Sequence, residues 1–185
     1  MGAGTGAAAR GFGALPIDPK LAQHLEFFLK LRTPTLVQAR ALPPILRGAD
    51  VLVRAETGSG KTLAYLLPIV QRLLDGSRER RYARELGTLA LVLAPTRELC
   101  FQTVEAAAAL TRPLPWLVSG AVVGGENRKA EKARLRKGVS LLVATPGRLG
   151  DHLNNTESLR VDYLQAIVLD EADRCARSRP CPCLR

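Results

Sequence analysis

A glycine-rich segment around residue 58 carries the residue types that bind phosphate groups. It reads Ala55-Glu-Thr-Gly-Ser-Gly-Lys-Thr62, after an apolar stretch and before a helical pattern. Glycines let backbone amides approach phosphate oxygens, and the start of a helix adds positive partial charge there. The Lys61 ammonium could reach the β- and γ-phosphates of a nucleotide, and the Thr62 hydroxyl could bind Mg²⁺. The strict eight-residue pattern of a phosphate-binding loop begins with glycine, and here Ala55 takes that place. The alternative to a phosphate site is therefore a glycine-rich turn that precedes Lys-Thr by chance.

An acidic run ends a second apolar segment, Ala166-Ile-Val-Leu-Asp-Glu-Ala-Asp173. If this segment is a strand of an open α/β sheet, its carboxylates lie at the edge where such sheets bind ligands. Asp170 would then hold Mg²⁺ through a water molecule, and Glu171 would deprotonate an attacking water as the general base. An ordinary acidic loop is the alternative, and the phosphate-binding pattern upstream argues against it.

The elements that must position these motifs alternate along the chain. Apolar runs predict strands at 51–54, 89–94, 116–123, 139–144 and 166–169. Helical patterns lie at 18–31, 35–47, 60–74, 96–110, 126–137 and 146–153. Strands that alternate with helices predict an α/β fold with a mostly parallel sheet and helices on both of its faces.

Composition excludes several classes of protein. The chain has 185 residues, 46% of them hydrophobic and 24% charged, which argues against global disorder. There is no apolar run of 18 residues, so we expect no membrane span, and the first ten residues lack a signal-peptide core. The four cysteines, at 100, 175, 181 and 183, match no usual zinc spacing and are expected to be free thiols. The net charge of +10 suggests a polyanionic partner.

With these motifs in order, the chain from Phe12 to Asp173 resembles the DEAD-box ATP-dependent RNA helicases, in their amino-terminal RecA-like domain. Pro34-Thr-Leu-Val-Gln38 is similar to the family's adenine-reading segment, and the Gln38 amide can both donate to and accept from adenine. Phe12 occupies the place of an upstream aromatic residue. The usual Gly-aromatic pair is replaced by Lys30-Leu31, which predicts weaker contact with the base.

The resemblance implies ATP and Mg²⁺ as cofactors. Lys61, Asp170 and Glu171 would be catalytic, and Thr62 and Asp170 would hold the metal ion. The residues expected to bind ATP are Phe12, Leu31, Gln38, Ala55, Glu56, Thr57, Gly58, Ser59, Gly60, Lys61 and Thr62.

Three further segments look like the family's RNA-contacting motifs, and each follows a predicted strand. The residues expected to bind RNA are Pro95, Thr96, Arg97, Glu98, Gly124, Gly125, Thr145, Pro146, Gly147 and Arg148. Arginine–phosphate and backbone contacts carry no base information, so sequence-independent binding is expected. One alternative is that each segment is an ordinary strand-to-helix turn. Another is that Arg97 or Arg148 holds neighbouring loops together instead of binding phosphate.

A basic segment, 126–137, has six bases and two acids, and it places Arg128, Lys132 and Arg136 on one helix face. This face is either simply solvated or an auxiliary site for RNA phosphates. The stretch GGENRKAEKARLRKG also looks like the branch of the family that assembles the large ribosomal subunit in the nucleolus. That resemblance implies a nuclear, nucleolar location.

The chain departs from the family pattern after Asp173. Family members continue into an apolar helix and a strand with a Ser-Ala-Thr motif, whereas residues 174–185 contain four arginines and two prolines. We expect residues 1–11 to form a flexible N-terminal segment and residues 12–173 to form an incomplete RecA-like domain, truncated after the Asp-Glu-Ala-Asp strand. Residues 174–185 are expected to form a disordered tail.

Three functions remain open on the sequence. The first is the ATP- and RNA-binding half of an RNA helicase, which would hydrolyse ATP slowly without the arginine fingers of a second domain. The second is a catalytically inactive form that competes for RNA or for a helicase cofactor protein. The third, a GTPase-like switch, is disfavoured by Gln38 and the Asp-Glu-Ala-Asp run. A monomer without membrane association is expected.

Overall fold

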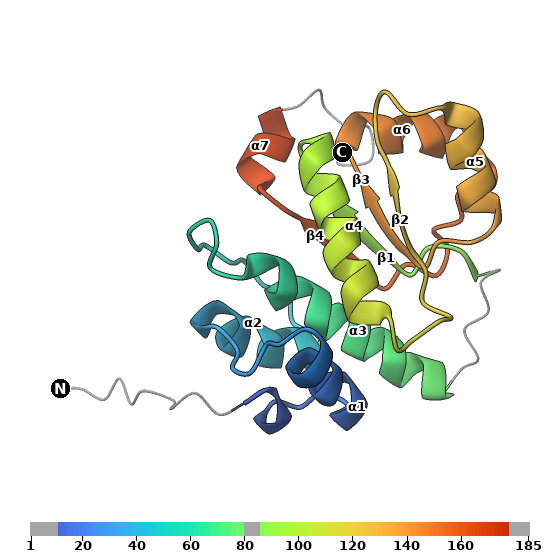
Figure 1. Cartoon of the computed structure of the whole chain (residues 1–185). Coiled ribbons are helices and arrows are strands. Elements are labelled where there is room, and N and C mark those ends of the chain that lie inside the picture. The colour runs from blue at the N-terminus through green and yellow to red at the C-terminus, as the bar shows by residue number, and fades with distance from the viewer. Residues whose placement is uncertain (1–10, 80–85, 178–185) are drawn as a thin grey trace. The chain divides into compact units, whose positions relative to one another are not determined.

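The computed structural model describes residues 11–79 and 86–177. The chain divides into two compact units, Met1–Arg72 and Leu73–Arg185. The boundary falls inside helix α3 (Lys61–Glu79) and within the range 12–173 that the sequence predicts as one domain. Those domain limits stay a prediction, and each unit is described by itself below (Figure 1).

In residues 11–72 of the first unit, all regular secondary structure is helical. A 3₁₀ turn (Phe12–Ala14) precedes α1 (Pro19–Gln23), which continues as a π-helical turn (His24–Phe28). The Asp18 carboxylate accepts from the Lys20 amide at 2.7 Å and Pro19 opens the helix, two features typical of helix starts. Helix α2 (Leu36–Leu46) and the first three turns of α3 complete the unit. The helix expected at 18–31 is therefore split between two helical geometries.

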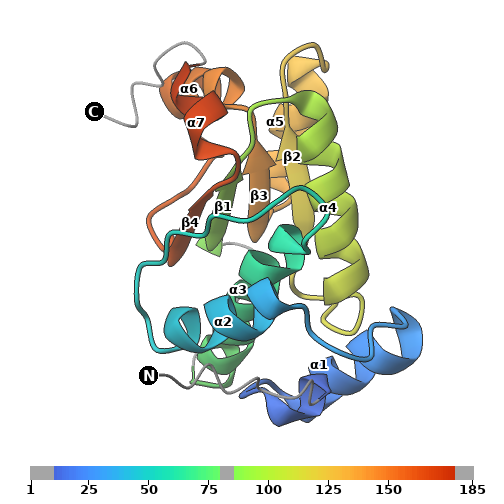
Figure 2. The ribbon, with the colours of Figure 1, turned by 90° about the vertical axis from the view of Figure 1, so that its left-hand side faces the viewer.

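The second unit contains a four-stranded parallel sheet. The strands are β1 (Ala90–Leu93), β2 (Ser119–Val122), β3 (Leu141–Ala144) and β4 (Ala166–Leu169), in the order β2-β3-β1-β4. Ala90 pairs in register with Leu141 on one side and with Ala166 on the other. Helices α4 (Arg97–Thr111), α5 (Arg128–Arg136) and α6 (Pro146–Asn155) connect the strands, and α7 (Ala172–Arg177) follows β4 (Figure 2).

Helices cover both faces of this sheet, as the sequence predicts. On one face, Leu91 and Leu142 pack in a buried cluster with Leu135 of α5 and Leu149 of α6. Helix α4 packs against β2 and β3, and its buried side chains lie outside that cluster, because alternate residues of a strand point to opposite faces. Strands β1 and β3 are buried throughout, which explains their continuous apolar sequences.

The strand expected at 51–54 is not formed. Residues 51–56 have no regular secondary structure, and the side chain of Leu52 is 95% exposed. An apolar Val-Leu-Val sequence favours an extended chain, but a strand exists only where a neighbour accepts its backbone hydrogen bonds. None of the four described strands pairs with this segment. The prediction of a strand before the glycine-rich loop was therefore wrong for this structure.

The ordered chain also runs past Asp173, where a disordered tail was expected to begin. Residues 174–177 lie in α7, and the Cys175 side chain is only 4% exposed. Its thiol donates to the Asp170 carbonyl at 3.2 Å, so a buried side chain ties the helix to the end of β4. The prolines that predicted disorder, at 180 and 182, lie outside the described residues, as do residues 178–185 and 1–10.

Candidate nucleotide and nucleic-acid sites

The glycine-rich loop of the first unit has the shape that a phosphate site requires. Gly58 and Gly60 both have positive φ, +79° and +89°, which side chains rarely allow. A Cβ on Gly58 would meet nothing within 4 Å, so the backbone is open on that side. The Ser59 hydroxyl donates to the Glu56 carbonyl at 2.7 Å and closes the turn. The loop therefore offers accessible backbone at the start of α3, where a helix attracts anions.

The Lys61 ammonium lies over this loop. It donates to the Ala55 carbonyl at 2.7 Å and to the Glu56 carbonyl at 3.2 Å. These two neutral acceptors hold a charged donor that a phosphate would attract more strongly. The open loop and this cation fit the triphosphate of a nucleotide. Thr62, half-buried in the first turn of α3, supplies the hydroxyl expected at Mg²⁺.

Gln38 connects the predicted adenine-reading segment to the same loop. Its Oε1 accepts from the Thr35 amide at 2.9 Å, and its Nε2 donates to the Gly60 carbonyl at 3.2 Å. The Thr35 hydroxyl in turn accepts from the Gln38 amide, so the two residues form a capping box at the start of α2. Gln38 is 4% exposed. Its amide group is thus engaged within the protein, and reading of adenine by Gln38 stays a prediction.

The two apolar residues expected beside the base differ in exposure. Phe12 is 3% exposed, so its ring belongs to the interior of the first unit and presents no face for stacking on a base. Burial of an aromatic ring removes a large apolar area from water and so stabilises the fold. The sequence motif alone did not reveal that Phe12 is buried in this way. Leu31 is half-buried and follows Lys30, whose φ of +58° is unusual for a side-chain-bearing residue. Leu31 is therefore the accessible apolar candidate.

The acidic motif forms a tight turn at the end of β4. Glu171 has a φ of +48°, a strained value that is common at functional sites. Its amide donates to the Asp170 carboxylate at 3.0 Å, and its carboxylate pairs with Arg174 at 2.7 Å. Both acids are half-buried. Thr62 and Asp170 belong to different units, so joint binding of Mg²⁺ by this pair stays a prediction.

The three predicted RNA-contacting segments share one edge of the sheet in the second unit. Residues 95–98 follow β1, Gly124 and Gly125 follow β2, and residues 145–148 follow β3. Because the strands are parallel and neighbours, these loops lie at their common carboxyl edge, together with Asp170 and Glu171 after β4. Thr96 caps α4 by accepting from the Leu99 amide at 3.3 Å, and Pro146 opens α6.

The two arginines of these segments have different environments. Arg97 is exposed and makes no hydrogen bond or ion pair with any residue that the structure describes. Its guanidinium lies over Gly125, where a Cβ would meet Nη1 at 2.5 Å. Arg148 has a side chain only 9% exposed, and its Nε donates to the Glu131 carboxylate at 2.7 Å. For Arg148, the structure therefore shows the alternative arrangement, in which the arginine holds neighbouring loops together.

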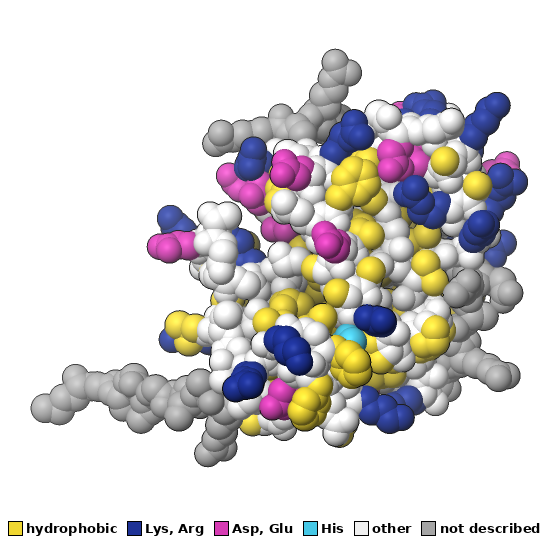
Figure 3. Space-filling view, viewed as in Figure 1, with side chains coloured by type: hydrophobic (Ala, Val, Ile, Leu, Met, Phe, Trp, Pro, Cys, Tyr) yellow, Lys and Arg dark blue, Asp and Glu magenta, His cyan; other side chains and the backbone are white. Residues whose placement is uncertain are grey.

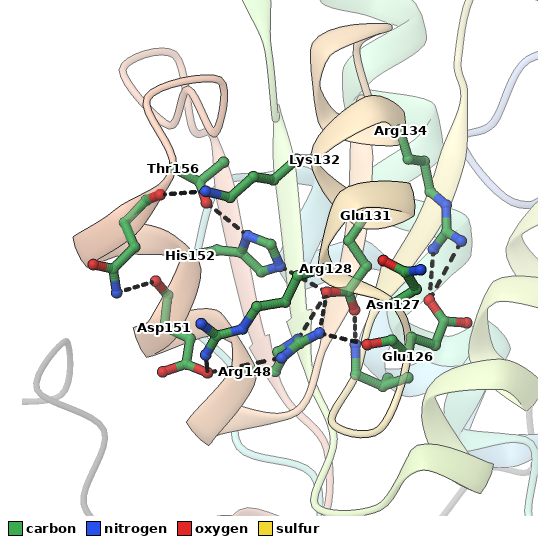
Figure 4. Close-up of polar contacts among 12 residues, drawn as sticks. Glu126, Asn127, Arg128, Glu131, Lys132, Arg134, Arg148, Asp151, His152 and Thr156 are labelled. Atoms are coloured by element: carbon green, nitrogen blue, oxygen red, sulfur yellow. Dashed lines mark hydrogen bonds and ion pairs between the residues drawn. The ribbon is translucent and has the colours of Figure 1, made fainter.

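A buried polar network surrounds Arg148 (Figure 4). The fully buried Glu131 carboxylate accepts from the Val123 amide at 2.9 Å and lies 2.9 Å from His152 Nε2. His152 Nδ1 lies 2.9 Å from the Thr156 hydroxyl. Burial by itself raises the pKa of Glu131. Hydrogen bonds from Arg148, His152 and Val123 outweigh that effect, so the pKa lies below its ordinary value of 4.5.

Sequence reasoning assigned no role to Glu131, His152 or Thr156. One signal was available, because Glu131 lies four residues before the buried Leu135 and therefore on the inward face of a basic helix. An acid on that face has to find partners inside the protein. No comparable signal marks His152, whose buried partner Glu131 lies 21 residues away in another helix.

The basic face of α5 is partly occupied by contacts within the second unit. Arg128 pairs with Asp151 of α6 at 2.7 Å, and Lys132 donates to the Asn155 carbonyl at 2.9 Å. Only Arg136 has no such contact among the described residues. Figure 3 shows Lys and Arg side chains over α5, and acidic side chains near α7. For two of the three basic residues, helix-to-helix contact therefore replaces a free charged face.

The described cysteines are free thiols, as expected. Both Cys100 and Cys175 are buried, and burial raises the pKa of the Cys100 thiol to about 12. Such a thiol is protonated and unreactive near neutral pH. Cys181 and Cys183 lie outside the described residues. Within the described ranges, no helix combines the length and the apolar character that crossing a membrane demands.

Comparison with known proteins agrees with the motifs. The chain is 51% identical over 160 residues to "Probable ATP-dependent RNA helicase CG8611" of Drosophila melanogaster, which covers 86% of this chain and 16% of that protein. It is 47% identical over 174 residues to "ATP-dependent RNA helicase DBP7" of Chaetomium globosum, covering 90% and 22%. It is also 48% identical over 163 residues to "ATP-dependent DNA helicase DDX31" of Dictyostelium discoideum, covering 88% and 18%.

The chain thus spans about a fifth of the length of these curated relatives. A family model described as DEAD/DEAH box helicase matches residues 35–180, a range that contains the glycine-rich loop, all three edge segments and the acidic turn. Since this match covers most of the sequence, the chain belongs to the DEAD/DEAH box helicase family.

Proposed function

We propose that this chain is the ATP- and RNA-binding amino-terminal half of an ATP-dependent RNA helicase. The observation that carries the proposal is the shared carboxyl edge in the second unit. There the three predicted RNA-contacting segments and the Asp170-Glu171 turn follow four neighbouring parallel strands. A polyanion that lies along this edge would touch backbone at Gly124, Gly125 and Gly147, and the exposed guanidinium of Arg97 would pair with a phosphate. Such contacts do not depend on base sequence.

The glycine-rich loop supports the nucleotide part of the proposal. Its open backbone and Lys61 would bind the β- and γ-phosphates of ATP, and Thr62 and Asp170 would hold Mg²⁺, which neutralises charge on the phosphates when it is bound. Leu31 would lie beside the base. Glu171 would accept a proton from the attacking water, for which its carboxylate must leave Arg174. That ion pair is largely solvent-exposed on the arginine side, so its exchange costs little.

The measurement that tests this function is RNA-stimulated ATP hydrolysis by the chain. We expect slow turnover that RNA increases and that both Lys61→Ala and Glu171→Gln abolish. Glu105→Gln, which changes an exposed acid on α4, is the control and should keep the wild-type rate. Absence of nucleotide binding in the wild-type chain would contradict the proposal. Comparison of ATP with GTP tests whether Gln38 reads the base, because equal affinity would exclude that role.

A second candidate is a form that binds RNA or a helicase cofactor protein without turnover. The Glu171–Arg174 ion pair favours it, because a carboxylate oxygen that contacts a guanidinium at 2.7 Å is occupied and does not bind an attacking water. RNA binding without ATP hydrolysis above background, in the presence of Mg²⁺, would support this candidate over the first.

The finer cellular proposal is a nucleolar role in assembly of the large ribosomal subunit. It rests on the resemblance of Gly124–Gly138 to that branch of the family. Several relatives share the name DBP7, which is consistent with membership of this chain in a single branch of the family. A tagged chain should concentrate in the nucleolus, and exclusion from it would contradict this part. We also propose that the chain is a monomer, which sedimentation at several concentrations would test.

A further inference from the structure

Glu131 contacts both of the segments that enclose the middle of the RNA-facing edge. Its carboxylate accepts from the Val123 amide, directly before the Gly124-Gly125 loop, and from Arg148 in the first turn of α6. Arg148 in turn donates through Nη2 to the Glu126 carbonyl at 2.8 Å, directly after that loop. The loop is therefore held at both ends, once by Glu131 itself and once through Arg148 (Figure 4).

The other side of the carboxylate is also fixed. His152 Nε2 lies 2.9 Å from the same Glu131 oxygen that Arg148 contacts, and the ring is itself held by the Thr156 hydroxyl. Glu131 is fully buried and His152 is 3% exposed, so water does not compete for these contacts. Satisfied networks of this kind fix side-chain geometry more firmly than exposed pairs do.

We propose that Glu131 is a positioning residue for RNA binding, held by His152 and Thr156. In this role Arg148 joins the loop to α6, and its charge is neutralised inside the protein. The two loops then meet RNA as one preformed surface whose phosphate contacts come from backbone amides and from Arg97. The inference rests on the RNA binding proposed above and adds to it which residues keep the surface in shape.

The decisive test uses the sign of a charge effect. Glu131→Gln removes a negative charge from the unit that faces RNA, so electrostatics alone predicts tighter binding. Loss of positioning predicts weaker binding, by roughly threefold to thirtyfold. Affinity is measured by fluorescence anisotropy with a labelled oligouridylate of about ten nucleotides at low salt. The control is Glu105→Gln, the same change at an exposed acid without a described contact.

A second variant separates a joining role for Arg148 from a direct phosphate contact. Lysine keeps the charge, but it cannot reproduce the fork that reaches both Glu131 and the Glu126 carbonyl. If Arg148 binds phosphate, Arg148→Lys keeps most of the RNA affinity. If Arg148 joins the loops, Arg148→Lys weakens RNA binding to a similar degree as Glu131→Gln.

Two further measurements guard against a general loss of folding. Thr156→Val breaks only the outermost link of the network with a side chain of similar size, and it should weaken RNA binding by about twofold. ATP affinity, which depends on the loop in the first unit, should stay at the wild-type value in every variant. Wild-type or tighter RNA binding by a folded Glu131→Gln chain would overturn the inference alone. Absence of RNA binding in the wild-type chain would overturn the proposed function as well.

Discussion

Arg97 and Gly125, which belong to different predicted RNA-contacting segments, lie in direct contact. The guanidinium of Arg97 covers Gly125 so closely that a Cβ at this position would meet Nη1 at 2.5 Å. Gly125 also has a φ of +84°, so both its conformation and its neighbour require glycine. The absence of a Cβ at the second glycine therefore lets the Arg97 guanidinium, which has no ion pair among the described residues, lie at the carboxyl edge of the sheet.

This contact predicts different effects for alanine at the two neighbouring glycines. Gly125→Ala should lower the free energy of unfolding by about 1–3 kcal/mol, because it strains the backbone and displaces Arg97. Gly124→Ala should change it by less than about 0.5 kcal/mol, because its φ is not positive and a Cβ there meets nothing within 4 Å. Urea unfolding followed by circular dichroism measures both, and equal effects would contradict the assignment.

The contact between Gln38 and Gly60 predicts a second effect. Gln38→Glu replaces the amide donor with an oxygen that faces the Gly60 carbonyl, in a site that is 4% exposed. We expect a loss of about 1–3 kcal/mol in the free energy of unfolding and weaker ATP binding. Gln23→Glu, the same change at an exposed position of α1, should affect neither. Thermal unfolding and titration with a fluorescent ATP analogue provide the measurements.

The low pKa of Glu131 predicts an acid-dependent stability. Because the folded-state pKa lies below the ordinary 4.5, the folded chain binds this proton more weakly than the unfolded chain. The stabilisation is therefore complete above about pH 5 and is lost as the pH falls through the folded-state value. Glu131→Gln should be less stable than wild type at pH 7, by roughly 3 kcal/mol, and the difference should shrink below pH 4. A difference that is constant between pH 3 and pH 7 would exclude this linkage.

The outer edge of β4 predicts where aggregation of the monomeric chain begins during prolonged incubation. Among the described strands β4 pairs only with β1, and it exposes Ile167 at 60% and Leu169 at 42%. Exposed apolar edge strands promote aggregation, and a lysine opposes it. Ile167→Lys should delay aggregation in light scattering, with a change in unfolding free energy of less than about 0.5 kcal/mol. Tyr163→Lys adds the same charge at a 55% exposed residue outside the strand, and it should delay aggregation less.

The sequence by itself determined those features that depend on a few neighbouring residues. Four of the five predicted strands and the parallel α/β class follow from continuous apolar runs between helical patterns, and β4 has the bounds that were predicted. The glycine-rich turn at 55–62, in which the structure gives Gly58 and Gly60 positive φ, and the motifs at strand ends were likewise identified from local residue types. Family membership followed from the order of those motifs.

Only the tertiary structure decided which partners these residues have. Val51-Leu-Val53 has a strand-like sequence and yet no partner among the strands that the structure describes, because pairing depends on a neighbour that local pattern does not specify. Arg97 and Arg148 have similar local contexts, but Arg97 is exposed without an ion pair to any described residue, whereas Arg148 is neutralised by a buried carboxylate. That carboxylate comes from another helix, 17 residues away. Burial and the low-dielectric contacts it creates arise from such distant neighbours, and these decide whether a charged group faces RNA or holds the fold together.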